Sequence, residues 1–126
     1  MAKPAKRETT DTKKGPIQDL REWVERVEEL GDLVRVTDAV SCDEEMSAIG
    51  YLVAKQNPSP AILFDNIKGY EKSPYKARSL WNILGPSIPR IALTLEEPPD
   101  TPTVELIRRV KDKLKARTAP REVAQN

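Results

Sequence analysis

A cysteine and three carboxylates follow one another in the segment Cys42-Asp43-Glu44-Glu45. Clustered carboxylates can bind a divalent metal or transfer protons. A thiol at a helix N-terminus can have a lowered pKa and act as a nucleophile. The same carboxylates also stabilise the start of a helix through its dipole. We favour this structural role, because the chain has no histidine and no second cysteine that could act with Cys42 as a base or as a resolving partner.

Polar side chains also follow or interrupt two apolar runs. Asp65 and Asn66 come directly after the run at residues 61–64, and Asn82 lies within the run at residues 80–84. Each set either presents polar groups to a ligand or has a structural role. In the structural role Asp65 and Asn66 end a strand, and Asn82 ties neighbouring loops together. We favour this role for both sets, and we expect Trp23 and Trp81 to pack in the core rather than stack on a ligand.

Histidine is absent from all 126 residues. Its absence excludes the Ser-His-Asp and Cys-His catalytic arrangements and the usual zinc sites, because each of these needs an imidazole. The glycines are too dispersed for a phosphate-binding loop or a dinucleotide fingerprint: Gly15, Gly31, Gly50, Gly69 and Gly85. The residues therefore identify no catalytic, cofactor-binding or metal-binding side chain.

The composition predicts one domain with unpacked ends. Hydrophobic residues make up 38% and charged residues 33% of the chain, a low apolar share for a compact fold. Residues 1–16 contain no Val, Ile, Leu or aromatic side chain, and residues 118–126 contain one Val. About 100 residues remain to build a core, and a domain of that size buries only ~60–65% of the surface of its unfolded chain. We expect the unit to be marginally stable alone or to depend on a partner.

The chain carries no signal for export or for a membrane. One cysteine cannot form an intrachain disulfide, and the N-terminus lacks the apolar region of a secretory signal. No apolar run approaches the ~20 residues of a membrane span. We therefore expect a cytoplasmic protein.

Charge is unevenly spread although the formal net charge is only +1. Residues 17–60 contain ten Asp or Glu and four Lys or Arg, a balance of −6. Residues 106–126 contain seven Lys or Arg and two Asp or Glu, a balance of +5. Such asymmetry is typical of a nucleic-acid-binding face or of a solvated helix.

The spacing of apolar residues predicts alternating helices and strands in the first half of the chain. Residues 19–30 form a helix with Asp19 as its N-cap and Gly31 just beyond its C-terminus. A short strand follows at residues 33–36. Ser41 with Glu44 has the pattern of a capping box for a second helix, in which Gly50 permits close packing. Residues 57–60, Asn-Pro-Ser-Pro, end that helix, and a central strand follows at 61–64.

The second half is predicted to contain one more buried strand and two more helices. The strand covers residues 77–84, and a short helix follows with Ser87 as a possible cap. The last helix has Thr101 as its cap and Pro102 at its first position. This helix carries an apolar stripe that needs a protein surface: Val104, Ile107, Val110 and Leu114. Basic residues surround the stripe: Arg108, Arg109, Lys111, Lys113, Lys115 and Arg117.

These elements predict an α/β fold with a small sheet of about three strands and four helices. The predicted organisation has five parts: a disordered basic leader at 1–16, an α/β unit at 17–95, a linker at 96–102, a basic amphipathic helix at 103–117 and a flexible tail at 118–126. Three strands are few for a self-sufficient sheet with two covered faces.

Four segments, in this order, resemble the N-terminal region of the UbiD family of decarboxylases. They are DLREWVERVEELGDLVRV (19–36), EEMSAIGYLVAK (44–55), PAILFDNIKGY (60–70) and WNILGPSIPRIAL (81–93). The resemblance covers about residues 19–115. The chain departs from the family where Ser41-Cys42 replaces the Asp-Pro that often precedes the second helix, which affects only the local turn.

The resemblance implies an activity that this chain does not carry alone. Enzymes of the family remove CO₂ reversibly from aromatic or α,β-unsaturated carboxylic acids, use prenylated flavin mononucleotide with a divalent metal (manganese) and potassium, and are usually oligomers. Their flavin, metal and proton-transfer residues lie downstream of the region seen here and include a metal-ligating histidine. We therefore expect residues 61–70 to be scaffold and the chain to bind no cofactor alone.

Three functions remain open. The first is the N-terminal segment of a UbiD-type carboxy-lyase, inactive alone and partnered by the remaining catalytic part. The second is a stand-alone binding or regulatory module that pairs with a UbiD-like enzyme through an exposed apolar face. The third and weakest is a nucleic-acid binder that uses the basic last helix and the basic leader.

Overall fold

A computed structural model describes residues 15–74, 77–120 and 122. The predicted leader therefore lies almost wholly outside the described residues, as do five residues of the predicted tail: 121 and 123–126. The elements in chain order are α1 (Leu20–Glu29), β1 (Leu33–Val36), α2 (Glu45–Ala54), β2 (Ala61–Phe64), β3 (Ser79–Trp81), α3 (Ile88–Thr94) and α4 (Thr103–Lys115). The predicted fold class, a small sheet with four helices, is confirmed for this part of the chain.

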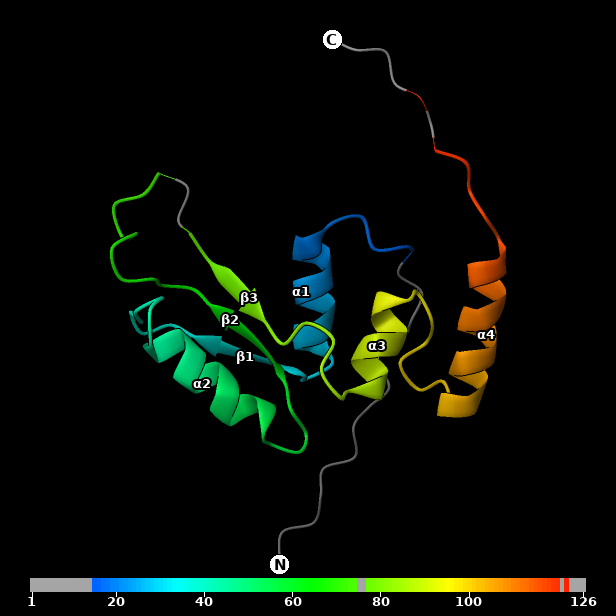
Figure 1. Cartoon of the computed structure of the whole chain (residues 1–126), viewed down its shortest axis with the longest axis horizontal. Coiled ribbons are helices and arrows are strands. Elements are labelled where there is room, and N and C mark those ends of the chain that lie inside the picture. The colour runs from blue at the N-terminus through cyan, green and yellow to red at the C-terminus, as the bar shows by residue number, and fades with distance from the viewer. Residues whose placement is uncertain (1–14, 75–76, 121, 123–126) are drawn as a thin grey trace, which may run out of the picture.

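The sheet is mixed, with β2 at its centre (Figure 1). β1 pairs with β2 in parallel, so that Leu33 lies opposite Ala61, and β3 pairs with β2 antiparallel, so that Ile62 lies opposite Trp81. All four residues of β2 are buried. An unbroken apolar run is what a strand covered on both faces requires, because its side chains point alternately to the two faces.

The alternation of β2 divides the core into two clusters. Ile62 and Phe64 face α2, where they pack with Val40, Met46 and Ile67. Ala61 faces α1 and α3, where it packs with Trp23, Val27 and Leu93. One helix therefore covers one face of the sheet and two helices cover the other.

Both predicted termini of α1 are confirmed. The Asp19 carboxylate accepts hydrogen bonds from the backbone N–H groups of Arg21 and Glu22, at 2.8 and 2.9 Å. Gly31 has a φ of +70°, and the next two N–H groups, of Gly31 and Asp32, donate back to the carbonyls of Glu28 and Val27. This pattern ends a helix and turns the chain directly into β1.

The capping box predicted for α2 is wrong: the cap position is Glu44 rather than Ser41, and the carboxylate that Ser41 contacts is that of Glu45 rather than Glu44. α2 begins at Glu45, and Glu44 makes no capping hydrogen bond with its side chain. Instead the Glu45 carboxylate accepts a 2.6 Å bond from the backbone N–H of Ser41, whose hydroxyl accepts one from the N–H of Asp43. Ser41 and Glu45 thus hold a non-helical turn at 42–44, one residue longer than a capping box would have.

The close packing predicted at Gly50 is confirmed. A Cβ at this position would lie 2.7 Å from Cε3 of Trp81, far inside van der Waals contact. α2 can therefore approach the sheet only because residue 50 lacks a side chain.

The predicted strand at residues 77–84 is much shorter in the structure. β3 ends at Trp81, because Asn82 has a φ of +54° and leaves the extended conformation. Asn is one of the few non-glycine residues that tolerate this left-handed backbone. The chain then turns through Gly85 into α3, whose predicted cap is confirmed: the Ser87 hydroxyl accepts a bond from the N–H of Arg90.

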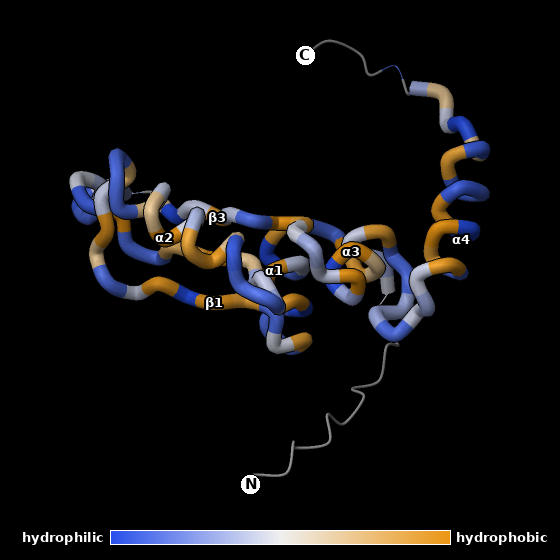
Figure 2. Tube along the Cα trace, turned by 60° about the horizontal axis from the view of Figure 1, so that its bottom comes forward, coloured by the Kyte–Doolittle hydropathy of each residue, from blue (hydrophilic) through white to orange (hydrophobic). Residues whose placement is uncertain are grey.

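α4 is set apart from the sheet, beyond α3, and hydrophobic positions recur along it (Figure 2). It begins at Thr103 with Pro102 in the cap position, so the prediction of Thr101 as cap and Pro102 as first residue is wrong by one residue. Leu106 is its buried residue, and Arg109 and Lys113 pair with Glu97 at 3.0 and 2.7 Å. Over the described ranges, no helix is long and apolar enough to cross a membrane.

Candidate functional site

The acidic segment beside Cys42 is occupied by structural contacts. Glu45 accepts bonds from Ser41 and from the Lys68 ammonium, whose Nζ lies 2.8 Å from Oε2. The bond from Lys68 lowers the pKa of Glu45 below its ordinary value, and the bond from Ser41 adds to this effect. A carboxylate held ionised in this way is a poor general acid. Cys42 is exposed and free.

Metal-ligating side chains do not gather in the described part of the chain. None of its His, Cys, Asp or Glu residues form a group of three or more that could hold an ion. The consecutive carboxylates at 43–45 therefore do not converge on a common point.

Asp65 and Asn66 connect the ends of the parallel strands. The Asp65 carboxylate lies 3.2 Å from Nη1 of Arg35 on β1 and 3.6 Å from Nη1 of Arg78. The Asn66 carbonyl accepts a bond from the N–H of Val40. Arg35 also pairs with Glu28 of α1 at 2.7 Å, and these carboxylates raise the pKa of the Arg35 guanidinium. The network joins α1, β1 and β2, which is the structural role favoured from the sequence.

Asn82 ties two loops together, which is the role favoured from the sequence. Its amide donates to the Ser59 hydroxyl at 2.8 Å and to the Pro60 carbonyl at 2.7 Å. The segment that enters β2 is thus fixed to the end of β3. An amide donor already in use offers little to a ligand.

Arg90 is the largest fully buried side chain among the described residues, and the sequence analysis assigned it no role. Its guanidinium donates to the carbonyls of Leu84, Asp32 and Ser59 at 3.0 to 3.1 Å, and it pairs with the Asp32 carboxylate at 3.0 Å. Burial lowers the pKa of Arg90, and the attraction of Asp32 opposes this shift. An arginine remains charged in a protein, so these acceptors satisfy a buried cation. We call Arg90 and its acceptors, Asp32, Ser59 and Leu84, the arginine clamp.

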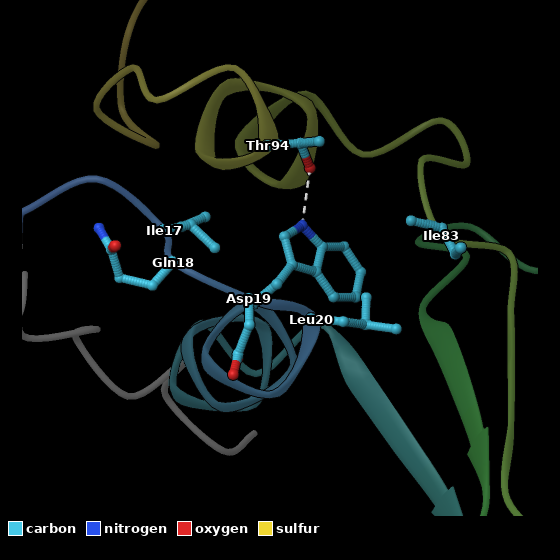
Figure 3. A pocket seen from close by; sticks show the side chains of 7 residues that line it. Ile17, Gln18, Asp19, Leu20, Ile83 and Thr94 are labelled. Atoms are coloured by element: carbon cyan, nitrogen blue, oxygen red, sulfur yellow. Dashed lines mark hydrogen bonds between the residues drawn. The ribbon is translucent and has the colours of Figure 1, made fainter. Parts of the chain in front are cut away.

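A shallow apolar groove of about 290 Å³ lies between the start of α1, the end of α3 and the loop after β3. Figure 3 shows Ile83 on one side of it and Ile17 on the other, with Thr94 above. The indole N–H of Trp23 donates to the Thr94 hydroxyl at 2.9 Å, the bond drawn in that view. Drug-sized ligands usually occupy ~300–1,000 Å³ with several convergent polar groups, so this groove is at the lower limit of size.

The polar groups around the groove are already engaged. Thr94 also donates to the Arg90 carbonyl, Gln18 donates to the Pro16 carbonyl, and Asp19 caps α1. The lining contains no cationic side chain that could meet a phosphate. A flavin nucleotide needs such polar contacts, so the groove does not fit it, and we assign no step of a reaction to this chain's own residues.

The sequence matches the profile of a known family, the 3-octaprenyl-4-hydroxybenzoate carboxy-lyase N-terminal domain, over residues 24–110, more than half of the chain. The chain belongs to this family. The UbiD resemblance expected from the four motifs is therefore confirmed, and so is its restriction to the N-terminal region.

Curated relatives of this carboxy-lyase domain are phenolic acid decarboxylases. The chain is 36% identical over 89 residues to the enzyme of Bacillus subtilis (strain 168) and 33% identical over 90 residues to that of Streptomyces sp. (strain D7). These matches cover 70% and 71% of this chain but 18% of each relative. The chain thus spans about a fifth of the length of the curated enzymes that it matches.

Solved structures of a decarboxylase also match most of this chain but only a small part of their own length. The vanillic acid decarboxylase of Sedimentibacter hydroxybenzoicus in an open form matches with a TM-score of 0.71 and 28% identity, over 84% of this chain and 21% of that one. The closed form matches with a TM-score of 0.67 and 29% identity, over 81% and 20%. The sheet and helices described above are the N-terminal part of a UbiD-like fold.

Proposed function

We propose that this chain is the N-terminal segment of a UbiD-type carboxy-lyase and that it acts there as a scaffold. The observation that carries the proposal is the family match over residues 24–110. The polar side chains in the described residues support it, because they are engaged in holding the sheet together, through the arginine clamp and the Arg35–Asp65 network. The catalytic part is then a further polypeptide, continuous with this chain or separate from it.

The reaction proposed for the whole enzyme is the reversible removal of CO₂ from an aromatic or α,β-unsaturated carboxylic acid. The names of the relatives, phenolic acid and vanillic acid decarboxylases, favour a phenolic acid among these. The prenylated flavin mononucleotide, divalent metal and potassium implied by the resemblance would be held by the remaining part of the enzyme. The cytoplasmic location and an oligomeric assembly stay predictions.

A chimeric enzyme tests this function. The full 126-residue chain replaces the matching N-terminal region of the Sedimentibacter vanillic acid decarboxylase, and the protein is produced in cells that make prenylated flavin. We expect CO₂ release from vanillic acid by the chimera. We expect none from the same enzyme lacking the N-terminal region or from the 126-residue chain alone.

Two results would contradict the proposal. A chimera that folds but releases no CO₂ would show that the chain cannot serve as this segment. Binding of prenylated flavin by the isolated chain, seen as a shifted flavin absorbance, would show that it is more than a scaffold.

A regulatory module that pairs with a complete enzyme is the second candidate, favoured by the exposed apolar residues of α4. The isolated chain would then change the CO₂ release of an unmodified decarboxylase when added to it, whereas a scaffold segment would not. Nucleic-acid binding is disfavoured, because half of the basic residues predicted around the stripe already form ion pairs: Arg109, Lys113 and Lys115.

A further inference from the structure

The outer face of α4 is apolar and faces solvent. Val104, Ile107 and Leu114 are 64%, 62% and 77% exposed. Residues three, four or seven positions apart lie on one side of a helix, so these three side chains form a single row together with Lys111. We call this row, with the neighbouring Arg108, the outer face of α4. Apolar residues scattered singly on a surface need no explanation, but an aligned row marks an interaction site.

The ends of this chain are poorly suited to cover the row. Residues 1–14 contain no Val, Ile, Leu or aromatic side chain, and residues 118–126 contain one Val. An apolar helix face is buried favourably only against other apolar surface. The occupant is therefore to be sought in another part of an assembly.

The charges on the outer face of α4 indicate which charge the partner surface should carry. Arg108 and Lys111 form no ion pair with any residue that the structure describes, whereas Arg109 and Lys113 both pair with Glu97 on the inner side. Two copies of α4 packed face to face would bring these cations together, and like charges across an interface are unfavourable. A second copy is thus disfavoured, and an apolar surface bordered by carboxylates is favoured.

The relatives contain a large part that this chain does not match. The chain covers 21% of the vanillic acid decarboxylase chain that it resembles, so most of that enzyme lies outside the match. α4 is the last helix of the described residues, and the family match ends within it, at residue 110. We propose that the outer face of α4 docks on the remaining, catalytic part of the decarboxylase, in an apolar groove rimmed by acidic side chains. This inference rests on the function proposed above.

Thiol labelling tests the docking directly. In a Cys42→Ser background, Ile107→Cys places a thiol on the outer face of α4, and Leu52→Cys places one on the outer side of α2. Leu52 is the matched control, because it is also a helical apolar residue and is 62% exposed, as is Ile107. Each variant is labelled with a maleimide, both as the isolated chain and within the chimeric enzyme, and the labelled peptides are quantified by mass spectrometry.

In the isolated chain we expect both positions to react at similar rates. In the chimera, docking should slow the labelling at position 107 by ~10-fold or more, which corresponds to about 1.4 kcal/mol of protection. The labelling at position 52 should stay as it is in the isolated chain. Ile107→Glu should lower the CO₂ release of the chimera, whereas Leu52→Glu should not.

The outcomes separate the two proposals. An active chimera in which position 107 reacts as fast as in the isolated chain overturns the docking proposal and leaves the proposed function standing. Equal protection at positions 107 and 52 also overturns it, because the effect would not be specific to α4. Protection at 107 that grows with the concentration of the isolated chain would show that a second copy is the occupant. A folded but inactive chimera overturns both proposals.

Discussion

The strand β2 and the helix α4 both carry a row of apolar side chains, and the surroundings of the two rows differ sharply. Every residue of β2 is buried, with α2 on one face of the sheet and α1 and α3 on the other. α4 buries Leu106 and leaves Val104, Ile107 and Leu114 exposed. The first region is complete within this chain, whereas the second is half of an interface. Stability should therefore depend on the clamp and the sheet, and assembly should depend on α4.

Removing the clamp should have the largest effect on stability. Arg90→Met leaves the Asp32 carboxylate without its cation and removes a donor from the carbonyls of Leu84, Asp32 and Ser59. Losing one partner of a buried ion pair costs ~3–5 kcal/mol. Unfolding in urea, followed by the fluorescence of Trp23 and Trp81, measures this cost. Arg108→Met is the matched control, because Arg108 is exposed on α4, and it should change stability by less than about 0.5 kcal/mol. Equal midpoints for the two variants would refute the role of the clamp.

Gly50→Ala should change the stability of the protein by less than Arg90→Met does, and a second substitution, at Trp81, should reverse the sign of the change. The added methyl group meets the Trp81 ring at 2.7 Å, and overpacking of this kind costs ~1–3 kcal/mol. The better helix propensity of alanine returns about 1 kcal/mol, so we expect a net loss of about 1 kcal/mol. In a Trp81→Leu background the clash is gone and the same change should stabilise the protein. A stabilising effect with Trp81 in place would be the opposite of what this packing predicts.

Acid should loosen α4. Hydrogen bonds from Lys113 and Arg109 lower the pKa of Glu97 below the ordinary value of 4.5. A group with a lowered pKa in the folded state stabilises it above the ordinary pKa, and this contribution is lost as the pH falls through the folded-state pKa. The methyl NMR signals of Leu106 should therefore change below about pH 4.5.

Two variants isolate the contribution of Glu97 to this transition. Glu97→Gln should already show the loosened signals at neutral pH and should lose the transition. Asp112→Asn breaks an exposed pair with Lys115 and should leave the transition in place. The same transition in Glu97→Gln would assign it to another carboxylate.

The smallest effect is expected on the outer face of α4. Ile107→Ser should change the stability of the isolated chain by less than about 0.5 kcal/mol, because the side chain is already exposed. Its neighbour Leu106 is buried, so Leu106→Ala should loosen the attachment of α4, which hydrogen exchange of the α4 amides measures. Should Ile107→Ser release α4 as strongly, the outer face would already have an occupant within this chain.

The sequence predicted well those features that depend on neighbouring residues. Asp19 and Gly31 delimit α1 because capping is local, and the run at 61–64 predicted the central strand because both of its faces are apolar. The caps of α2 and α4 were both misplaced, from Ser41 to Glu44 and from Thr101 to Pro102. Ser41 bonds to Glu45 rather than Glu44, and Pro102 itself is in the cap position, alternatives that have almost the same residue pattern.

Features that depend on distant residues could not be predicted. The strand predicted at 77–84 ends at Trp81, because the contacts of Asn82 with Ser59 and Pro60 are made in a left-handed backbone conformation. The clamp was missed for the same reason, since the acceptors of Arg90 lie up to 58 positions away. One signal was available: Arg90 is a lone charge among the apolar residues 88–93. The contacts of the candidate site residues could not be predicted for the same reason. Polar residues that could bind a ligand proved to bond to other parts of this chain.

The position of Arg90 in the chain has a consequence for synthesis. All its acceptors, in Asp32, Ser59 and Leu84, precede it, so the three strands leave the ribosome before the cation that fixes the loops around them. A nascent chain that stops before α3 leaves those acceptors without their donor. The loops around the sheet can therefore be fixed only once α3 has been made, whereas α4 follows after the clamp has closed. A product that is cut short between these two helices should still fold but should no longer assemble.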